Sequence, residues 1–87
     1  MKIKEEYVLR SIAGEHVVVP VGKEAVNFNG IMTLNHSGKL LFETLQKDVT
    51  KEELINVLLD EYEVTKEQAQ KDVEAFLSIL KERDLLA

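Results

Sequence analysis

Hydrophobic and polar positions follow two different periods along this chain, and the period changes near Asn35. Before that residue, three runs rich in β-branched residues are typical of strands, at 7–12, 16–19 and 31–34. Ala13-Gly14 between the first two runs predicts a tight turn, so these runs are expected to form a hairpin. Because Pro20 has no amide donor, it should close the second strand or lie on an unpaired edge.

The stretch from 22 to 30 has two interpretations. Asn29-Gly30 is a strong hairpin signal, and Val26-Asn27-Phe28 before it could form a short strand. Equally, the stretch could be a loop that connects the second strand to the strand at 31–34. We favour the loop.

After Asn35 the apolar residues recur with the 3.6-residue period of an amphipathic helix. The first helix begins at Asn35 or Ser37 as the N-cap residue, and its apolar side is formed by Leu41, Phe42 and Leu45. The second helix begins at a capping box, Thr50 with Glu53 at position N3. Its expected apolar side is Leu54, Val57, Leu58 and Tyr62.

The third helix repeats the capping device, with Thr65 as N-cap and Gln68 at N3, and extends to about Asp84. Its expected buried residues are Ala69, Val73, Phe76, Leu77 and Leu80. Leu85-Leu86 is apolar beyond the last helical charges and is expected to fold back onto the core. The prediction is one domain over residues 1–87 of the α+β class: a three-stranded antiparallel sheet followed by three helices. This layout resembles a winged helix-turn-helix with its sheet placed first.

Composition fits a small globular domain. The 87 residues suffice for one compact unit whose thin core depends on the 45% of residues that are hydrophobic. The start of the chain does not resemble a signal peptide, and no apolar run approaches the roughly 18 residues of a membrane helix. We therefore expect a cytoplasmic protein that does not bind a membrane.

Few residues suit catalysis or metal binding. The absence of cysteine excludes disulfides, thiolate metal sites and a cysteine nucleophile. His16 and His36 are far apart in sequence, and neither has an obvious carboxylate partner. Paired acids such as Glu52-Glu53 and Asp60-Glu61 are typical of a solvated helix face, and the glycines form no phosphate-binding pattern. We expect no enzyme activity, no cofactor and no metal.

Nucleic-acid binding or a regulatory role is the main alternative, because the second and third helices could form a docking pair. The net charge of −5 argues against it, and residues 51–64 carry five acids and one lysine. Such a surface would repel a phosphate backbone instead of gaining affinity from counterion release. We therefore expect no nucleic-acid partner.

A sheet edge is the feature that remains. The strand at 31–34 carries no charge and no proline, the residues that usually protect an edge from another extended chain. If Met32 and Leu34 face the core, Ile31 and Thr33 point the other way. Ile31 could instead be covered by Leu85-Leu86 or by the 22–30 loop, and a homodimer through this edge is a further possibility.

The order of motifs resembles the PqqD family. The residues from Ile31 to Gly38 followed by Leu41-Phe42 are similar to the family's "strand, Leu-Asn-x-x-Gly, aliphatic-aromatic" segment. The Thr50-x-x-Glu53-Leu54, Asp72-Val73-x-x-Phe76-Leu77 and Leu85-Leu86 motifs follow in the family's order, and the stretch 10–22 is similar to stand-alone members. Phe42 departs from the Trp that many relatives carry, which changes volume but not the core role.

The resemblance implies a RiPP precursor peptide recognition element. Such domains hold the leader segment of a ribosomally made peptide as an added strand, between the third strand and the third helix. They present it to a modifying enzyme, commonly a radical SAM maturase, and have no catalytic residues of their own. Mapped onto this sequence, the family's groove implies strand contacts by Ile31, Met32 and Thr33. Its helical wall would be formed by Asp72, Ala75, Phe76 and Ile79.

Overall fold

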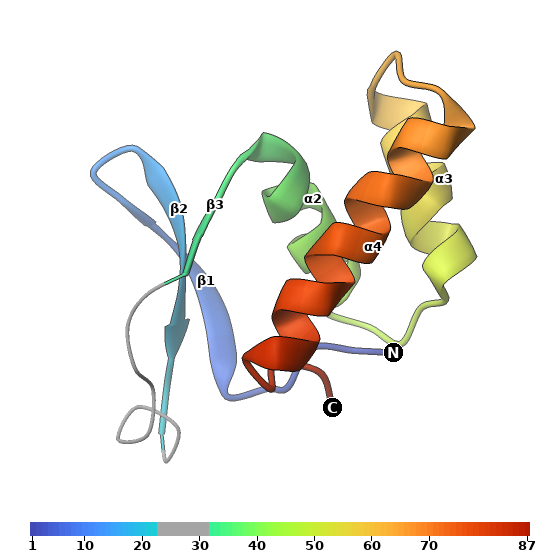
Figure 1. The fold of residues 1–87 in the computed structure, drawn as a ribbon. Helices are drawn as coiled ribbons and strands as arrows, with labels where there is room; N and C mark the ends of the chain where they lie inside the picture. The colour runs from blue at the N-terminus through green and yellow to red at the C-terminus, as the bar shows by residue number, and fades with distance from the viewer. Residues whose placement is uncertain (23–31) are drawn as a thin grey trace.

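The first elements of the protein form an antiparallel sheet. A computed structural model describes residues 1–22 and 32–87, and Figure 1 shows their arrangement. β1 (Tyr7–Ile12) pairs with β2 (Glu15–Pro20), with Tyr7 opposite Pro20 and Ile12 opposite Glu15. Between them Ala13 and Gly14 have φ values of 51° and 81°, as a type I′ hairpin turn requires. The predicted hairpin and the strand end at Pro20 are confirmed.

β3 (Met32–Leu34) completes the sheet by pairing antiparallel to β2, so the strand order is β1-β2-β3. The choice between loop and hairpin for 22–30 concerns a stretch that, after Gly22, lies outside the described residues. Ile31 also lies outside them.

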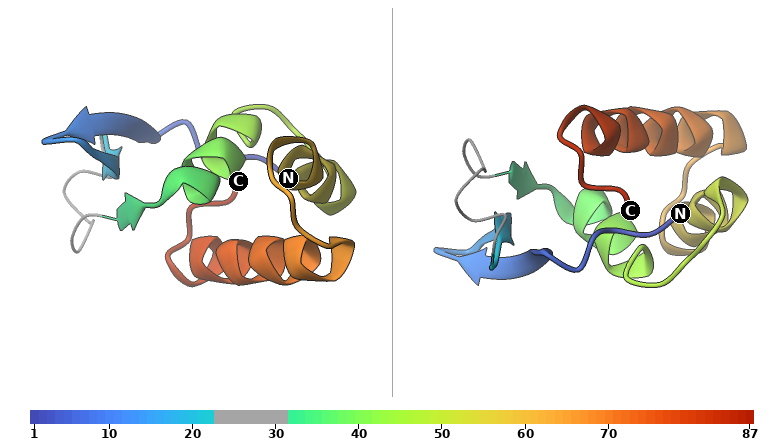
Figure 2. Two further views of the ribbon diagram at one scale, coloured as in Figure 1. Left: turned by 90° about the horizontal axis from the view of Figure 1, so that it is seen from above. Right: turned by 90° about the horizontal axis from the view of Figure 1, so that it is seen from below.

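Three helices follow: α2 (His36–Thr44), α3 (Lys51–Glu61) and α4 (Lys66–Glu82). The three antiparallel strands and three helices confirm the predicted α+β class. Both views in Figure 2 place α2 between the hairpin and α3, with α4 along one side of the two helices. Since the chain passes from β3 into α2 through Asn35 alone, the end of β3 and the start of α2 form one corner of the molecule.

Side-chain caps explain where the helices begin. Asn35 caps α2, which decides between the two candidates, and Thr50 and Glu53 form the predicted capping box of α3. Thr65 caps α4 by accepting from the Gln68 backbone amide, but the prediction of a second capping box is wrong. The Gln68 side chain instead donates to the Asp72 carboxylate one turn later, at 2.9 Å. A charged carboxylate is a strong hydrogen-bond acceptor.

α4 ends at Glu82, two residues before the predicted end. Asp84 adopts a positive φ of 59°, the Leu85 amide donates to the Leu80 carbonyl, and the Asp84 amide donates to the Lys81 carbonyl. These bonds form a Schellman motif, which reverses the chain. As a result Leu85 is fully buried and Leu86 pairs with Ile3, which confirms that the C-terminal segment folds back onto the core.

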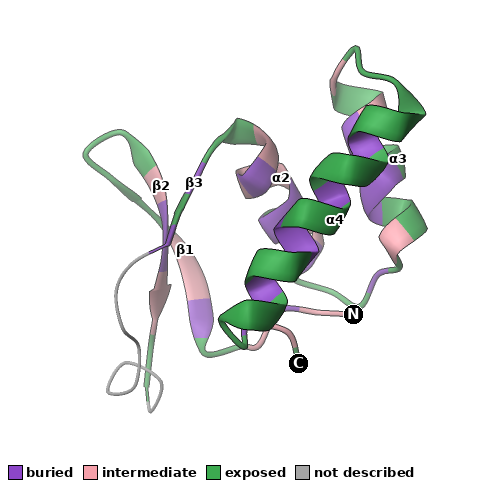
Figure 3. Ribbon diagram, in the orientation of Figure 1, coloured by how far each residue is buried: buried purple, intermediate pink, exposed green. Residues whose placement is uncertain are grey.

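The core lies between the sheet and the helices (Figure 3). Val18, Phe42, Val73 and Leu80 are among its fully buried members, so the core role expected of Phe42 is confirmed. All five residues predicted for the apolar stripe of α4 are buried. On α3, however, Ile55 is buried and Val57 is only partly so, because α3 packs against both α2 and α4 and buries a wider face than one stripe.

Among the described residues, no helix is both long and apolar enough to cross a membrane.

Candidate functional site

β3 is an edge strand. Within the described residues it pairs with β2 on one side, and no other strand pairs with its second side. Met32 and Leu34 are buried, whereas Thr33 between them is exposed, as strand alternation requires. The second side of β3 therefore carries backbone donors and acceptors without a strand partner in the described part of the chain.

A groove of about 460 Å³ runs between β3, the start of α2 and one face of α4. It is open to solvent, so α4 does not seal the edge of the sheet. Its lining combines apolar side chains with a few polar groups: Thr33, Leu34, Asn35, Ser37, Gly38, Leu41, Asp72, Ala75, Phe76 and Ile79.

The corner between β3 and α2 is held by Asn35. Its side-chain oxygen accepts from the Gly38 amide at 2.8 Å and from the Ser37 hydroxyl at 3.1 Å. A Cβ at position 38 would lie 3.2 Å from this oxygen and 3.3 Å from Leu34 Cβ. Glycine at 38 therefore allows β3 to approach the helix start closely.

α4 supplies the opposite wall. Ala75 and Ile79 lie beside the buried stripe, and Ile79 is 43% exposed, so its side chain is accessible from the groove. Phe76 is buried at the back of this wall. Asp72 stands at the end nearer the start of α4, where its carboxylate accepts from Gln68.

Five of the seven residues predicted for the site line this one groove: Thr33, Asp72, Ala75, Phe76 and Ile79. The side chain of Met32 is buried in the core, so Met32 can meet a ligand only through its backbone. Ile31 is outside the described residues, and its assignment to the site stays a prediction.

The prediction did not include the groove residues of the β3–α2 corner, namely Leu34, Asn35, Ser37, Gly38 and Leu41. The Asn35-x-x-Gly38 motif was the available signal. The sequence indicates Asn35 as one of two N-cap candidates and the motif as a family feature, whereas the structure makes the capped corner a wall of the groove as well.

The ion pairs that shift pKa values lie outside the groove. A hydrogen bond from Lys51 lowers the pKa of Glu74, which belongs to another face of α4. The N-terminal amine similarly lowers the pKa of Asp48. These carboxylates are occupied by structural ion pairs, so neither indicates proton-transfer chemistry in the groove.

The two histidines lie together, although the sequence separates them. Their ring centroids are 6.0 Å apart, because His16 pairs with Leu34 across β2 and β3 and His36 begins α2. Over residues 1–22 and 32–87, no group of three or more His, Cys, Asp or Glu side chains gathers to hold a metal ion.

The family model described as coenzyme PQQ synthesis protein D (PqqD) matches residues 15–86 of this sequence. The chain belongs to the PqqD family. No curated protein matches the chain. Two of the PqqD motifs named from the sequence border this groove: the segment that ends in Leu34-Asn35-x-x-Gly38 forms its corner, and Asp72-Val73-x-x-Phe76-Leu77 belongs to its α4 wall.

Two solved structures share the PqqD-family fold of this chain. One is described as TbiB1 in complex with the TbiA(beta) leader peptide; it is 24% identical, with a TM-score of 0.77 over 99% of this chain and 94% of that one. The other is lasso peptide synthetase B1 complexed with the leader peptide; it is 21% identical, with a TM-score of 0.74 over 97% of this chain and 93% of that one. At this identity the two structures establish the fold.

Proposed function

We propose that this PqqD-family protein binds the leader segment of a ribosomally made precursor peptide by strand addition to β3. The observation that carries the proposal is the edge of β3, which has no strand partner among the described residues and runs beside an open groove. An extended peptide added there would satisfy the free backbone groups of β3 and place alternate side chains against α4.

In this proposal the two walls of the groove contribute differently to peptide recognition. Backbone hydrogen bonds along β3 give affinity that depends little on peptide sequence, while Ala75, Phe76 and Ile79 offer an apolar surface that selects side chains. Because a free leader must become ordered on binding, its affinity should be modest for the area buried. The leader-peptide complexes of the two fold neighbours support this assignment.

In this proposal the whole chain is one peptide-recognition domain that acts as a non-catalytic adaptor in the cytoplasm. It presents the bound leader to a modifying enzyme, and a radical SAM maturase is the partner that the family suggests. The chemistry of modification then belongs to that enzyme.

The groove is tested by Ile79→Gln, with Ser78→Gln as the matched control. Ser78 and Ile79 are adjacent, exposed residues of α4, but only Ile79 lines the groove. The probe is a peptide selected against the protein from a displayed library of random sequences. Synthetic leaders from short reading frames beside the gene serve as competitors, with binding followed by fluorescence anisotropy.

We expect Ile79→Gln to weaken probe binding about tenfold, because burying an apolar side chain of this size contributes about 1.5–3 kcal/mol. Ser78→Gln should leave binding unchanged, and neither variant should lower the thermal stability noticeably. Equal affinities for both variants would exclude the groove as the binding site.

A further inference from the structure

A second pocket of about 290 Å³ adjoins the groove at the corner of the molecule. It lies between the start of α2, the end of α3 and the turn into α4, and its apolar wall is formed by Leu58, Tyr62 and Val64. Asn35, Ser37 and Asp72 line both the groove and this pocket. The two cavities therefore lie next to each other and share these three residues as a common border.

The second pocket is accessible as well as apolar. Leu58 is buried at its base, Tyr62 is half-buried, and Val64 is 36% exposed. The large hydrophobic residues exposed in the described part of the chain are Ile12, Val21, Val64 and Ile79, and two of these four stand at opposite ends of the two cavities. Exposed apolar side chains in two adjoining cavities suit a ligand that carries two apolar groups.

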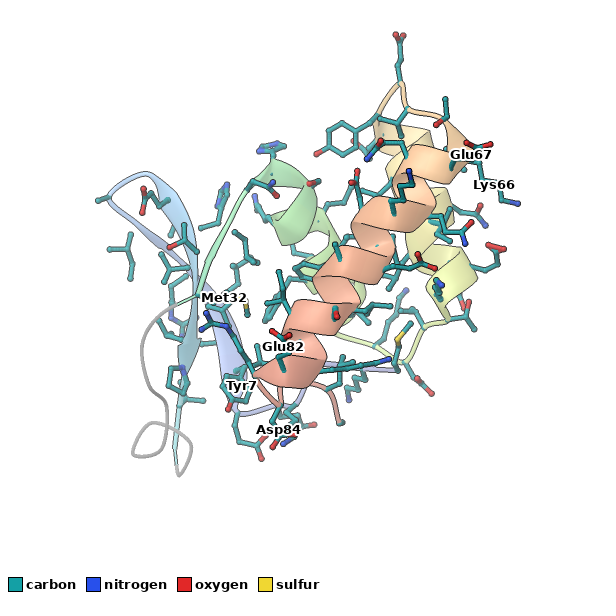
Figure 4. The ribbon with its side chains drawn as sticks, in the orientation of Figure 1. Tyr7, Met32, Lys66, Glu67, Glu82 and Asp84 are labelled. Atoms are coloured by element: carbon teal, nitrogen blue, oxygen red, sulfur yellow. The ribbon has the colours of Figure 1, made fainter. Side chains whose placement is uncertain are left out.

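Strand direction decides which part of a bound peptide reaches this pocket. Both strand pairs of the sheet are antiparallel, and antiparallel pairs are the commoner kind. A peptide added antiparallel to β3 would begin beside the end of β3, where Asn35 and the second pocket lie. It would finish toward the start of β3 and Ile79. Figure 4 shows how α4 runs relative to this edge: Glu82 at its end lies on the side of Met32, while Lys66 and Glu67 at its start lie far from it.

We propose that the second pocket holds an aliphatic or aromatic side chain located N-terminal to the added strand of the same leader peptide. The inference rests on the proposed function and adds a second anchor to it. The leader would then be recognised at two apolar positions, one against Val64 and one against Ile79, with the backbone of β3 between them.

The length of α4 sets the spacing of the two anchors. Val64 lies two residues before α4, and the helical part of the interval, from Lys66 to Ile79, spans 13 positions, about 20 Å at the helical rise of 1.5 Å per residue. An extended chain covers that distance in about six or seven residues. Since both anchors must face α4, alternation selects the even number, about six.

Asp72 adds a charge requirement between the anchors. Its carboxylate accepts from Gln68, and no cation pairs with it among the described residues. A Lys or Arg of the leader that passes Asp72 would supply the missing positive charge. The recognised leader is thus an apolar residue, then a basic residue, then an apolar residue about six positions after the first.

The experiment compares peptides selected from one displayed random library by the wild-type protein and by Val64→Gln, with Glu63→Gln as the control. Glu63 is the exposed neighbour of Val64 and does not line the pocket. Circular dichroism verifies that each variant is folded. We expect wild type and Glu63→Gln to enrich both apolar positions, and Val64→Gln to lose enrichment at the N-terminal position alone.

A double-mutant cycle tests the contact without relying on the fold of one variant. The N-terminal apolar residue of a selected peptide is changed to Ser and measured against wild type and Val64→Gln. The two changes should be coupled by a factor of about five or more, as for residues in contact. Independent effects, or the same two-anchor motif selected by Val64→Gln, would overturn the second anchor.

The outcomes separate this inference from the proposed function. If Ile79→Gln changes the selected motif and Val64→Gln does not, the leader occupies the groove but not the second pocket. If neither variant changes the selected motif, the proposed function itself is wrong.

Discussion

Gly38 illustrates how a single residue can shape the site. A methyl group at this position would lie 3.2 Å from the Asn35 side-chain oxygen and 3.3 Å from Leu34 Cβ. Neither neighbour can withdraw freely, since Asn35 holds the start of α2 with two hydrogen bonds and Leu34 is buried. The close approach of β3 to the helix therefore depends on glycine.

Gly38→Ala should destabilise the protein by about 1 kcal/mol. Alanine gains up to about 1 kcal/mol in helix propensity, but a weakened cap costs about 1 kcal/mol and an overpacked contact costs about 1–3 kcal/mol. Urea unfolding measures the difference. An unchanged or increased midpoint would show that the corner relaxes without loss of the cap.

Residue-level interpretation of the sequence succeeded where the chemistry is local. Asn35, Thr50 and Thr65 are N-caps because their side chains bond to amides only three residues away. The side chain of Gln68 could not be placed in the same way. Whether this side chain bonds to the backbone of Thr65 or to the carboxylate of Asp72 depends on its rotamer, which no sequence pattern predicts.

At the scale of elements, the apolar stripe of α4 and the alternation of β3 were predictable because each follows one period. Ala75 and Ile79, which lie beside that stripe, line the groove, and their contact with a peptide stays a prediction. The burial of Ile55 was not predictable from one stripe, because α3 contacts two helices at once. The Leu34–Gly38 corner was not predicted to line the groove, because the sequence indicates a helix cap and a family motif there but not which surface they face.

If β3 pairs with an added peptide strand, the backbone amides of that peptide should matter in alternation. Methylating single backbone nitrogens of a bound peptide should abolish binding at every second position along the added strand and be tolerated at the positions between. The reason is that alternate amides of a strand face one neighbour. Isothermal titration calorimetry of the methylated series measures this pattern. A loss that does not alternate would indicate a helical or irregular ligand.

At the scale of the whole molecule, the net charge of −5 favours peptide binding over nucleic-acid binding, and the two functions predict different salt dependence. We expect peptide affinity to change only slightly between 50 and 200 mM salt, and duplex DNA to bind negligibly. A protein that contacts six to ten phosphates would lose about 10³–10⁵ in affinity over that range. Anisotropy titrations with a peptide and a DNA duplex test both parts, and DNA binding with such a steep salt dependence would support the alternative function.

The arrangement of elements brings together parts of the chain that are distant in sequence. β3 and α4 are separated by more than 30 residues, yet both line the groove together with the start of α2. The same free edge would also permit a homodimer, which would be detected as a doubled mass in solution. A dimer through β3 would compete with the peptide, so adding peptide should dissociate it.

Amide hydrogen exchange of Met32, Thr33 and Leu34, measured by NMR with and without a selected peptide, tests strand addition most directly. Exchange slows when an amide becomes hydrogen-bonded and withdrawn from solvent. We predict new protection at the β3 amides that face away from β2, together with slower exchange near the groove face of α4. Protection confined to β1 or to α3, with β3 unchanged on binding, would contradict the account.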